Sequence, residues 1–233
     1  MNVVYYGHSC VGIETEGKSL IIDPFLSGNE LASASPDDIR TDAVLLTHAH
    51  TDHILDAEAV AKRNNAPVVA IFELANYMSW KGVQTIDMNM GGTVDLDFAK
   101  AKMIQAFHSS GIFLEEGHII YGGMAAGYII NAEGLNILHA GDTALFGDME
   151  MIGKRHSLDI AFIPIGDRYT MGIEDALQAA KWFNAKLTIP VHYNTFPPIR
   201  QEAERFVALL REQGMNGLVM KPGDTLDPGA FIG

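Results

Sequence analysis

The chain has 233 residues, of which 48% are hydrophobic, and its formal net charge is −13 at pH 7. The hydrophobic content excludes a disordered protein, and the length suits one domain, which we predict to cover residues 1–233 because no stretch resembles a linker. An acidic chain without a basic stripe is a poor partner for phosphate backbones, so we expect a small-molecule substrate and no nucleic acid.

Three further features concern the compartment of the protein. No apolar stretch has the length of a membrane span, and the N-terminus lacks the basic segment of a signal peptide, so we expect no membrane partner. The single cysteine, Cys10, excludes an internal disulfide framework and suits a small core residue as well as a functional one. A cytoplasmic enzyme is the simplest interpretation, and association into a homo-oligomer is left open.

The predicted elements begin with strands and continue as an alternation of strands and helices. Three strands are expected at 3–6, 11–15 and 19–22, and a polar loop over 27–42 could cover a site. A buried strand follows at 43–46, and a helix lies within 54–64. Later strands are expected at 67–71, 101–107, 121–130, 135–138, 158–165, 187–191 and 219–222, and later helices at 72–80, 173–183 and 199–213. This order predicts sheets in the centre with helices outside.

The most informative segment follows the strand at 43–46. Its sequence, Thr-His-Ala-His-Thr-Asp-His over 47–53, brings three imidazoles and a carboxylate together directly after an apolar run. Burying such groups without partners costs several kcal/mol, whereas neutral imidazole and carboxylate are ligands for Zn²⁺ and similar ions. His48 and His50 point the same way at positions i and i+2, so they can converge on one ion. Asp52 and His53 are placed to serve a second ion or to help the first, and a His-rich loop without a ligand is the disfavoured alternative.

Metal-capable side chains also follow several other predicted strands. Ligand sites gather at the carboxyl ends of strands in α/β arrangements, so these side chains are expected to converge on one site. Alone, each of them suits an ordinary hydrogen-bonded residue or a helix cap, but the cluster upstream favours ligands, with a bridging carboxylate among them. The candidates are His108, Asp142 and His192.

Other candidates have secondary roles. Asp23, which follows the strand at 19–22, is better suited to accept a hydrogen bond from a metal-bound imidazole than to bind metal itself. His8 either lines the pocket or only packs, and Asp167 with Arg168 could face the pocket from the end of another strand. The remaining histidines, His118, His139 and His156, are interpreted as structural or surface residues, and His139 could lie near the site.

These residues together resemble the metallo-β-lactamase superfamily. Asp23, His48-x-His50-x-Asp52-His53, His108, Asp142 and His192 occur in that family's order over nearly the whole chain. Within it, the Gly7-His8-Ser9 start and the motif at 165–172 are similar to small prokaryotic metal-dependent hydrolases related to ascorbate-6-phosphate lactonase-like proteins. The resemblance implies an α/β fold, a four-layer αββα sandwich with the metals at one edge. It also implies one ion held by His48, His50 and His108, a second held by Asp52, His53 and His192, and Asp142 between them.

The expected chemistry is metal-assisted hydrolysis. Two divalent ions, with Zn²⁺ the best fit and Mn²⁺ or Fe²⁺ also compatible, would share a water and lower its pKa from about 15.7 towards roughly 7. That water would attack an ester, lactone, amide or phosphodiester, and Asp52 could act as the catalytic proton acceptor if one ion is bound. Alternatives are a mononuclear-iron enzyme that oxidises a thiol or persulfide, and a non-catalytic metal-dependent binding protein. His50 stands where the flavo-di-iron branch has a carboxylate, which disfavours di-iron redox chemistry.

Overall fold

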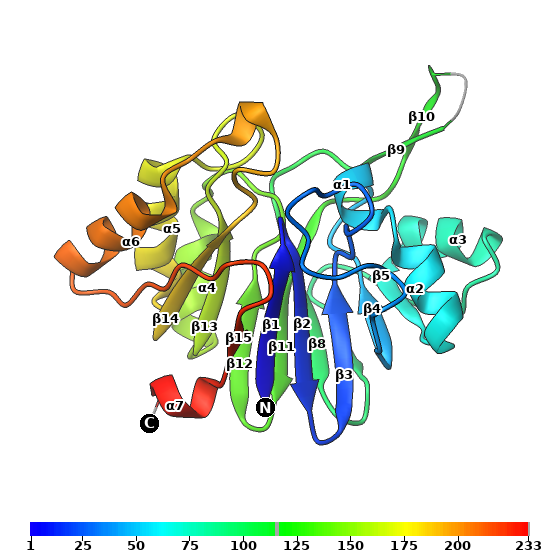
Figure 1. The fold of residues 1–233 in the computed structure, drawn as a ribbon, viewed down its shortest axis with the longest axis horizontal. Helices are drawn as coiled ribbons and strands as arrows, with labels where there is room; N and C mark the ends of the chain where they lie inside the picture. Colours follow the sequence, from blue (N-terminus) through cyan, green and yellow to red (C-terminus); the bar gives the residue numbers. More distant parts are fainter. Residues whose placement is uncertain (115–116, 233) are drawn as a thin grey trace.

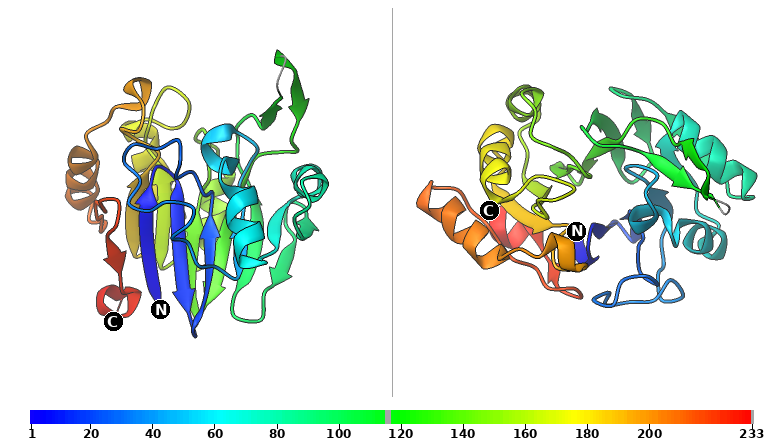
Figure 2. Two further views of the ribbon diagram at one scale, coloured as in Figure 1. Left: turned by 45° about the vertical axis from the view of Figure 1, so that its right-hand side comes forward. Right: turned by 90° about the horizontal axis from the view of Figure 1, so that it is seen from above.

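In the computed structural model, which describes residues 1–114 and 117–232, two β-sheets pack face to face and helices cover their outer sides (Figures 1 and 2). One core cluster contains side chains from both sheets, such as Ile13, Ile130 and Phe162. A second cluster lies between one sheet and its helices and includes Ile163, Phe183 and Phe206. The predicted four-layer αββα sandwich is therefore confirmed. Within the described residues, every helix is too short or too polar to cross a membrane.

The first sheet has seven strands in the order β15-β1-β2-β3-β4-β5-β6. The strands β1 to β3 form an antiparallel meander, and β3 to β6 run parallel to one another. Glu16 and Gly17 join β2 to β3 with φ of 53° and 77°, as the tight turn of a two-residue hairpin requires. The bounds are β1 Asn2–Gly7, β2 Cys10–Thr15, β3 Lys18–Ile22, β4 Ala43–Leu45, β5 Val68–Ile71, β6 Thr85–Met88 and β15 Thr225–Leu226.

The second sheet has six strands in the order β14-β13-β12-β11-β8-β7. The pairs from β7 to β12 are antiparallel, whereas β12, β13 and β14 run parallel and the last two are buried along their whole length. Their continuous apolar sequences are typical of strands covered on both faces. The bounds are β7 Thr93–Asp95, β8 Lys100–Gln105, β11 Ala126–Ala132, β12 Leu135–His139, β13 Ile160–Pro164 and β14 Leu187–Val191.

The helices divide between the two outer faces (Figures 1 and 2). The helices α2 and α3 pack against β4 and β5, and α5 packs against β13 with α4 and α6 beside it. A separate hairpin of β9, Gly111–Phe113, and β10, Ile119–Tyr121, extends away from the body of the molecule (Figure 1). The helix bounds are α1 Thr51–Ile54, α2 Ala57–Asn64, α3 Phe72–Trp80, α4 Asp148–Arg155, α5 Ile173–Phe183, α6 Ala203–Glu212, α7 Pro228–Ile232 and the 3-10 turn Pro197–Ile199.

Several predicted boundaries are wrong. The strand expected at 121–130 is two elements, because β10 ends at Tyr121 and β11 begins at Ala126 after a glycine-containing connection. The strand expected at 219–222 does not form, and β15 pairs with β1 instead. The helix expected within 54–64 is confirmed as α2, which follows the separate short helix α1, whereas the helix expected at 199–213 begins as α6 only at Ala203. The sequence did not predict the strands β6, β7, β9 and β15 or the helices α1, α4 and α7.

The strand directions explain where the functional side chains meet. In the first sheet β1, β3 and β4 run in one direction, and in the second β8, β12 and β14 run parallel to one another. Within each sheet the carboxyl ends of these strands therefore lie at the same edge. The residues that follow them are the sequence-predicted candidates, and the distances given below show that the two edges adjoin.

Candidate metal centre

Most candidate side chains stand just beyond the end of a strand, whereas Asp52 and His53 lie on the short helix α1 that comes after β4. His48 and His50 follow β4, His108 follows β8, and Asp142 follows β12. Three others turn the chain sharply: His8, Asp23 and His192 follow β1, β3 and β14 with φ of 55°, 48° and 56°. Non-glycine residues rarely adopt this left-handed conformation, which costs on the order of 1–3 kcal/mol and concentrates at functional sites. The backbone is therefore strained at the residues whose side chains form the candidate site.

The first group consists of His48, His50 and His108. One ring nitrogen from each lies within 4.8 Å of the other two. The Nε2 atom of His48 is 3.0 Å from Nδ1 of His50, which brings two basic nitrogens close together. Burial is the main cause that lowers the pKa of all three imidazoles, so the rings are neutral at pH 7 and able to bind a cation.

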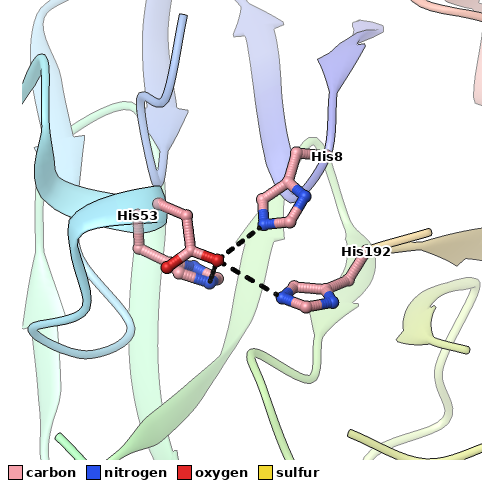
Figure 3. Close-up of side chains that lie close together, drawn as sticks. His8, His53 and His192 are labelled. Atoms are coloured by element: carbon pink, nitrogen blue, oxygen red, sulfur yellow. Dashed lines mark hydrogen bonds and ion pairs between the residues drawn. The ribbon is translucent and has the colours of Figure 1, made fainter. Parts of the chain in front are cut away.

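The second group surrounds Asp52. Figure 3 shows His8, His53 and His192 directed at one carboxylate oxygen, which the distances identify as Oδ2 of Asp52. This oxygen is 3.1 Å from Nε2 of His8, 3.7 Å from Nε2 of His192 and 4.0 Å from Nε2 of His53. The four donor atoms lie within 4.8 Å of one another, so they form a second possible metal site.

Asp142 lies between the two groups. Its Oδ2 atom is 2.9 Å from His192 Nε2 and 3.4 Å from His53 Nε2, both in the second group. The same oxygen is 3.6 Å from His108 Nε2 and 4.0 Å from His48 Nε2 in the first. A carboxylate in this position can be shared by two cations.

Unpaired polar atoms at the centre fit metal binding. Among the described residues, Nε2 of His53, both ring nitrogens of His192 and Oδ1 of Asp142 are buried without a hydrogen-bond partner. Although His192 Nε2 approaches Asp142 Oδ2 to 2.9 Å, the two atoms are not aligned for a hydrogen bond. Each unpaired buried group costs about 1–3 kcal/mol, and coordination to a cation would remove that cost. The donor set of imidazoles and carboxylates therefore fits divalent metal ions.

The carboxylates set the charge state of the second group. Burial alone would lower the pKa of His192, but the adjacent Asp142 outweighs it and raises the pKa to about 9. Burial likewise opposes protonation of His53, yet Asp142 and Asp23 raise its pKa. Burial favours the neutral acid of Asp142, but His192 and His53 hold its pKa well below the usual range. Without a cation, protons on these imidazoles balance the buried negative charge, and a metal ion would displace them.

Hydroxyl and carboxylate groups contact the ring nitrogens of several imidazoles that point away from the two metal groups. The buried Asp23 accepts from His53 Nδ1 at 2.7 Å, and from the backbone N–H and the hydroxyl of Thr47 at 2.8 and 2.6 Å. Thr47 Oγ1 is also 3.0 Å from His48 Nδ1, and Ser109 Oγ is 3.2 Å from His50 Nε2. These contacts leave the opposite ring nitrogens facing the centre, which is how second partners orient metal ligands. The sequence analysis singled out Asp23, whereas Thr47 and Ser109 carry no signal beyond standing next to histidines.

The other candidates lie apart from the two groups. Asp167 and Arg168 are exposed, and Asp167 belongs to none of the metal-capable groups that the described residues form. His139 is buried and pairs through Nε2 with the Ser9 carbonyl at 2.8 Å, so it is structural. Burial raises the pKa of the Cys10 thiol, which lies in the core. His118 is exposed and His156 is partly buried.

Asp23 also predicts a stability effect. Asp23→Ala leaves three buried donors unpaired, those of Thr47 and His53, and should lower the free energy of unfolding by on the order of 3 kcal/mol. Urea denaturation of the metal-free protein measures it. Glu58→Ala is the matched control, since this exposed carboxylate pairs with Lys62 at 2.7 Å and should contribute less than about 1 kcal/mol. Equal midpoints for Asp23→Ala and the control would contradict the structural role.

Comparisons with known proteins show which proteins this chain is similar to. Residues 2–192 match a family model described as a beta-lactamase superfamily domain. A "UPF0173 metal-dependent hydrolase" of Geobacillus thermodenitrificans is 54% identical over 227 residues, covering 97% of this chain and all of the relative. A relative of the same name from Bacillus cereus is 51% identical over 97% of this chain and 99% of its own length.

Solved structures share the fold. The structure of Igni18, described as a metallo hydrolase from the archaeon Ignicoccus hospitalis, superimposes with a TM-score of 0.87 at 36% identity, over 97% of both chains. An isothiocyanate hydrolase from Delia radicum gut bacteria has a TM-score of 0.75 at 20% identity, over 97% of this chain and 98% of its own. At that identity the second similarity concerns the fold alone.

Proposed function

Because this chain belongs to the beta-lactamase superfamily and, within it, to the UPF0173 family of metal-dependent hydrolases, we propose that it hydrolyses a small molecule with the help of two divalent metal ions. The main support for two ions is the position of Asp142, whose Oδ2 atom lies within 4.0 Å of imidazoles from both groups. His48, His50 and His108 would hold one ion, and Asp52, His53 and His192 the other. Asp142 would be shared between them.

The ions would supply a water of lowered pKa and a positive charge for the developing oxyanion. Because the ions would activate the attacking water and stabilise the oxyanion, no serine or cysteine nucleophile is required, and Cys10 is buried in the core. Asp52 has the most exposed carboxylate of the centre, with a side chain 29% exposed, and is ionised because its two histidine partners lower its pKa more than burial raises it. If a single ion is bound and Asp52 is not a ligand, this exposed carboxylate would act as the proton acceptor.

The donor set supports Zn²⁺ as the native metal, since imidazole with carboxylate suits this ion, although Mn²⁺ and Fe²⁺ accept similar ligands. A second complete group supports two-ion hydrolysis over oxidation of a thiol or persulfide by a single iron. A single domain, a cytoplasmic location and a homo-oligomeric state remain predictions from the sequence.

A cavity beside His108 supports a neutral substrate. It has a volume of about 480 Å³ and lies between the segment after β8 and the base of the β9–β10 hairpin. Its described lining contains no Asp, Glu, Lys or Arg and includes Phe107, Ile119, Tyr121 and Met124. Because the chain as a whole is strongly acidic, an uncharged wall next to a candidate metal ligand favours an ester or lactone with an apolar part over a charged phosphodiester.

A substrate panel tests this proposal. Zinc-loaded protein should hydrolyse an aryl ester of a medium-length acid or an aliphatic lactone faster than bis-p-nitrophenyl phosphate, and treatment with a chelator should abolish turnover. Tyr121→Ser should reduce hydrolysis of the ester and leave zinc content unchanged. Full activity in the chelator-treated protein would contradict metal-dependent hydrolysis, whereas a preference for the phosphodiester would contradict only the assignment of the cavity.

Metal affinity should depend on pH in a defined direction. His192 keeps its proton up to about pH 9 in the metal-free protein, and only the neutral ring binds a cation. Binding below that pH therefore releases protons, so affinity for the second ion should rise about tenfold or more per pH unit and level off above the pKa. A competition titration with a chromophoric chelator at several pH values measures this slope. Affinity that stays constant or falls with rising pH would contradict it.

A further inference from the structure

His8 lies in the second group but differs from the candidate ligands in one respect. Its ring is buried and both of its nitrogens have partners. Nε2 is 3.1 Å from Asp52 Oδ2 (Figure 3), and Nδ1 is 2.9 Å from the Thr195 hydroxyl. The Nε2 atom of His53 and both ring nitrogens of His192 are instead buried without hydrogen-bond partners. Within the second group, His8 is therefore the imidazole whose two nitrogens are already paired with other side chains, and we assign it a role beside the ion rather than on it.

The partners fix the direction of the hydrogen bonds. An ionised carboxylate can only accept, so His8 must donate to Asp52 from Nε2. The neutral ring then accepts at Nδ1, and Thr195 must donate its hydroxyl proton there. Thr195, His8 and Asp52 thus form a chain of hydrogen bonds that ends on a candidate metal ligand.

Several contacts fix the backbone and the ring of His8, whereas Asp52 lies on a short helix with fewer contacts of its own. The carbonyl of His8 accepts from the Tyr5 hydroxyl at 3.0 Å and from the backbone N–H of His192 at 2.8 Å. The rings of Phe25 and Phe196 lie 5.4 and 5.6 Å from its own, edge to face. Asp52 belongs to the four-residue helix α1 and has a partly exposed side chain.

We propose that His8 is a positioning residue for the second metal ion. Its ring holds Asp52 by a hydrogen bond, and its carbonyl holds the backbone of His192, so two ligands of that ion are oriented by one residue. The inference rests on the proposed two-ion site. Loss of comparable partners costs about 10- to 100-fold in metal affinity, and we expect a loss of this size for the second ion alone.

Two substitutions of His8 separate this role from packing. His8→Asn suits the left-handed backbone, leaves an amide near the Nδ1 position and is too short to reach Asp52, whereas His8→Gln can still donate to it. His8→Asn should weaken binding of the second Zn²⁺ about 10- to 100-fold, change the visible absorption of the Co²⁺-loaded protein, and leave the first ion unaffected. His8→Gln should restore part of that affinity.

Thr195 provides an independent variant if the His8 variants fold poorly. Thr195→Val removes the hydroxyl that fixes the ring of His8 and should weaken the second ion severalfold, while Thr195→Ser should bind as the wild type does. A two-ion wild type whose affinities and Co²⁺ spectrum are unchanged in His8→Asn and Thr195→Val would overturn the inference alone. A wild-type protein that takes a single ion would overturn the two-ion site, and this inference with it.

Discussion

Asp142→Asn should reduce bound zinc from two ions per chain to one or fewer and lower kcat/KM by on the order of 10³-fold. The carboxylate is the only group whose one oxygen approaches imidazoles of both groups among the described residues, at 2.9 to 4.0 Å. The amide keeps the shape of the side chain but removes the negative charge that two neighbouring cations require. Elemental analysis of the purified protein and steady-state kinetics measure the two effects.

Asp167→Asn is the matched control for this substitution. Asp167 also follows a strand of the second sheet, but it is exposed and lies outside the metal-capable groups, so the change should alter neither zinc content nor kcat/KM. Two zinc ions and wild-type activity in Asp142→Asn would show that Asp142 does not bridge.

His50→Ala should remove the first ion and with it most hydrolysis. Its Nδ1 atom lies 3.0 Å from His48 Nε2, so the alanine leaves a site with two nitrogens and one shared carboxylate. Loss of one of the four ligands should weaken zinc binding at this group, and we expect a loss of activity of at least about 10²-fold. Zinc content and activity are measured on the same preparation.

His118→Ala controls for the loss of an imidazole as such. This exposed histidine lies next to β10, away from the metal groups, so both readouts should match the wild type. If His50→Ala kept one full ion at the first group and retained activity, His50 would not be a ligand. Loss of zinc from both groups would instead indicate that the two ions bind cooperatively.

The fold was predictable where apolar residues alone define an element. The strand β14 and the helices α3 and α5 have the predicted bounds, because β14 is a continuous apolar run and α5 has a regular buried face. The strands β6, β7 and β9 were missed because they are short and partly exposed, so neighbouring strands rather than their own sequences determine them. The strand predicted at 121–130 is interrupted because Gly123 has a φ of 87°, which an extended strand does not adopt.

The positions of the candidate metal ligands followed from the sequence because each is a rare residue type at the end of an apolar strand. Their grouping around Asp142 was implied by the family resemblance and not by the residue pattern alone, since it depends on the meeting of two sheets. The roles of Thr47, Ser109 and Thr195 could not be predicted, because a hydroxyl residue in a loop has no distinctive pattern. The sequence did not decide whether His8 lines the pocket or only packs, because only the structure shows that β1 ends beside Asp52.

Anomalous diffraction at the zinc edge from crystals of the zinc-loaded protein tests the central claim most directly. The account predicts two peaks roughly 3.5–4 Å apart, one among His48, His50 and His108, the other beside His53 and His192, with Asp142 between them. A single peak, or peaks remote from Asp142, would contradict it.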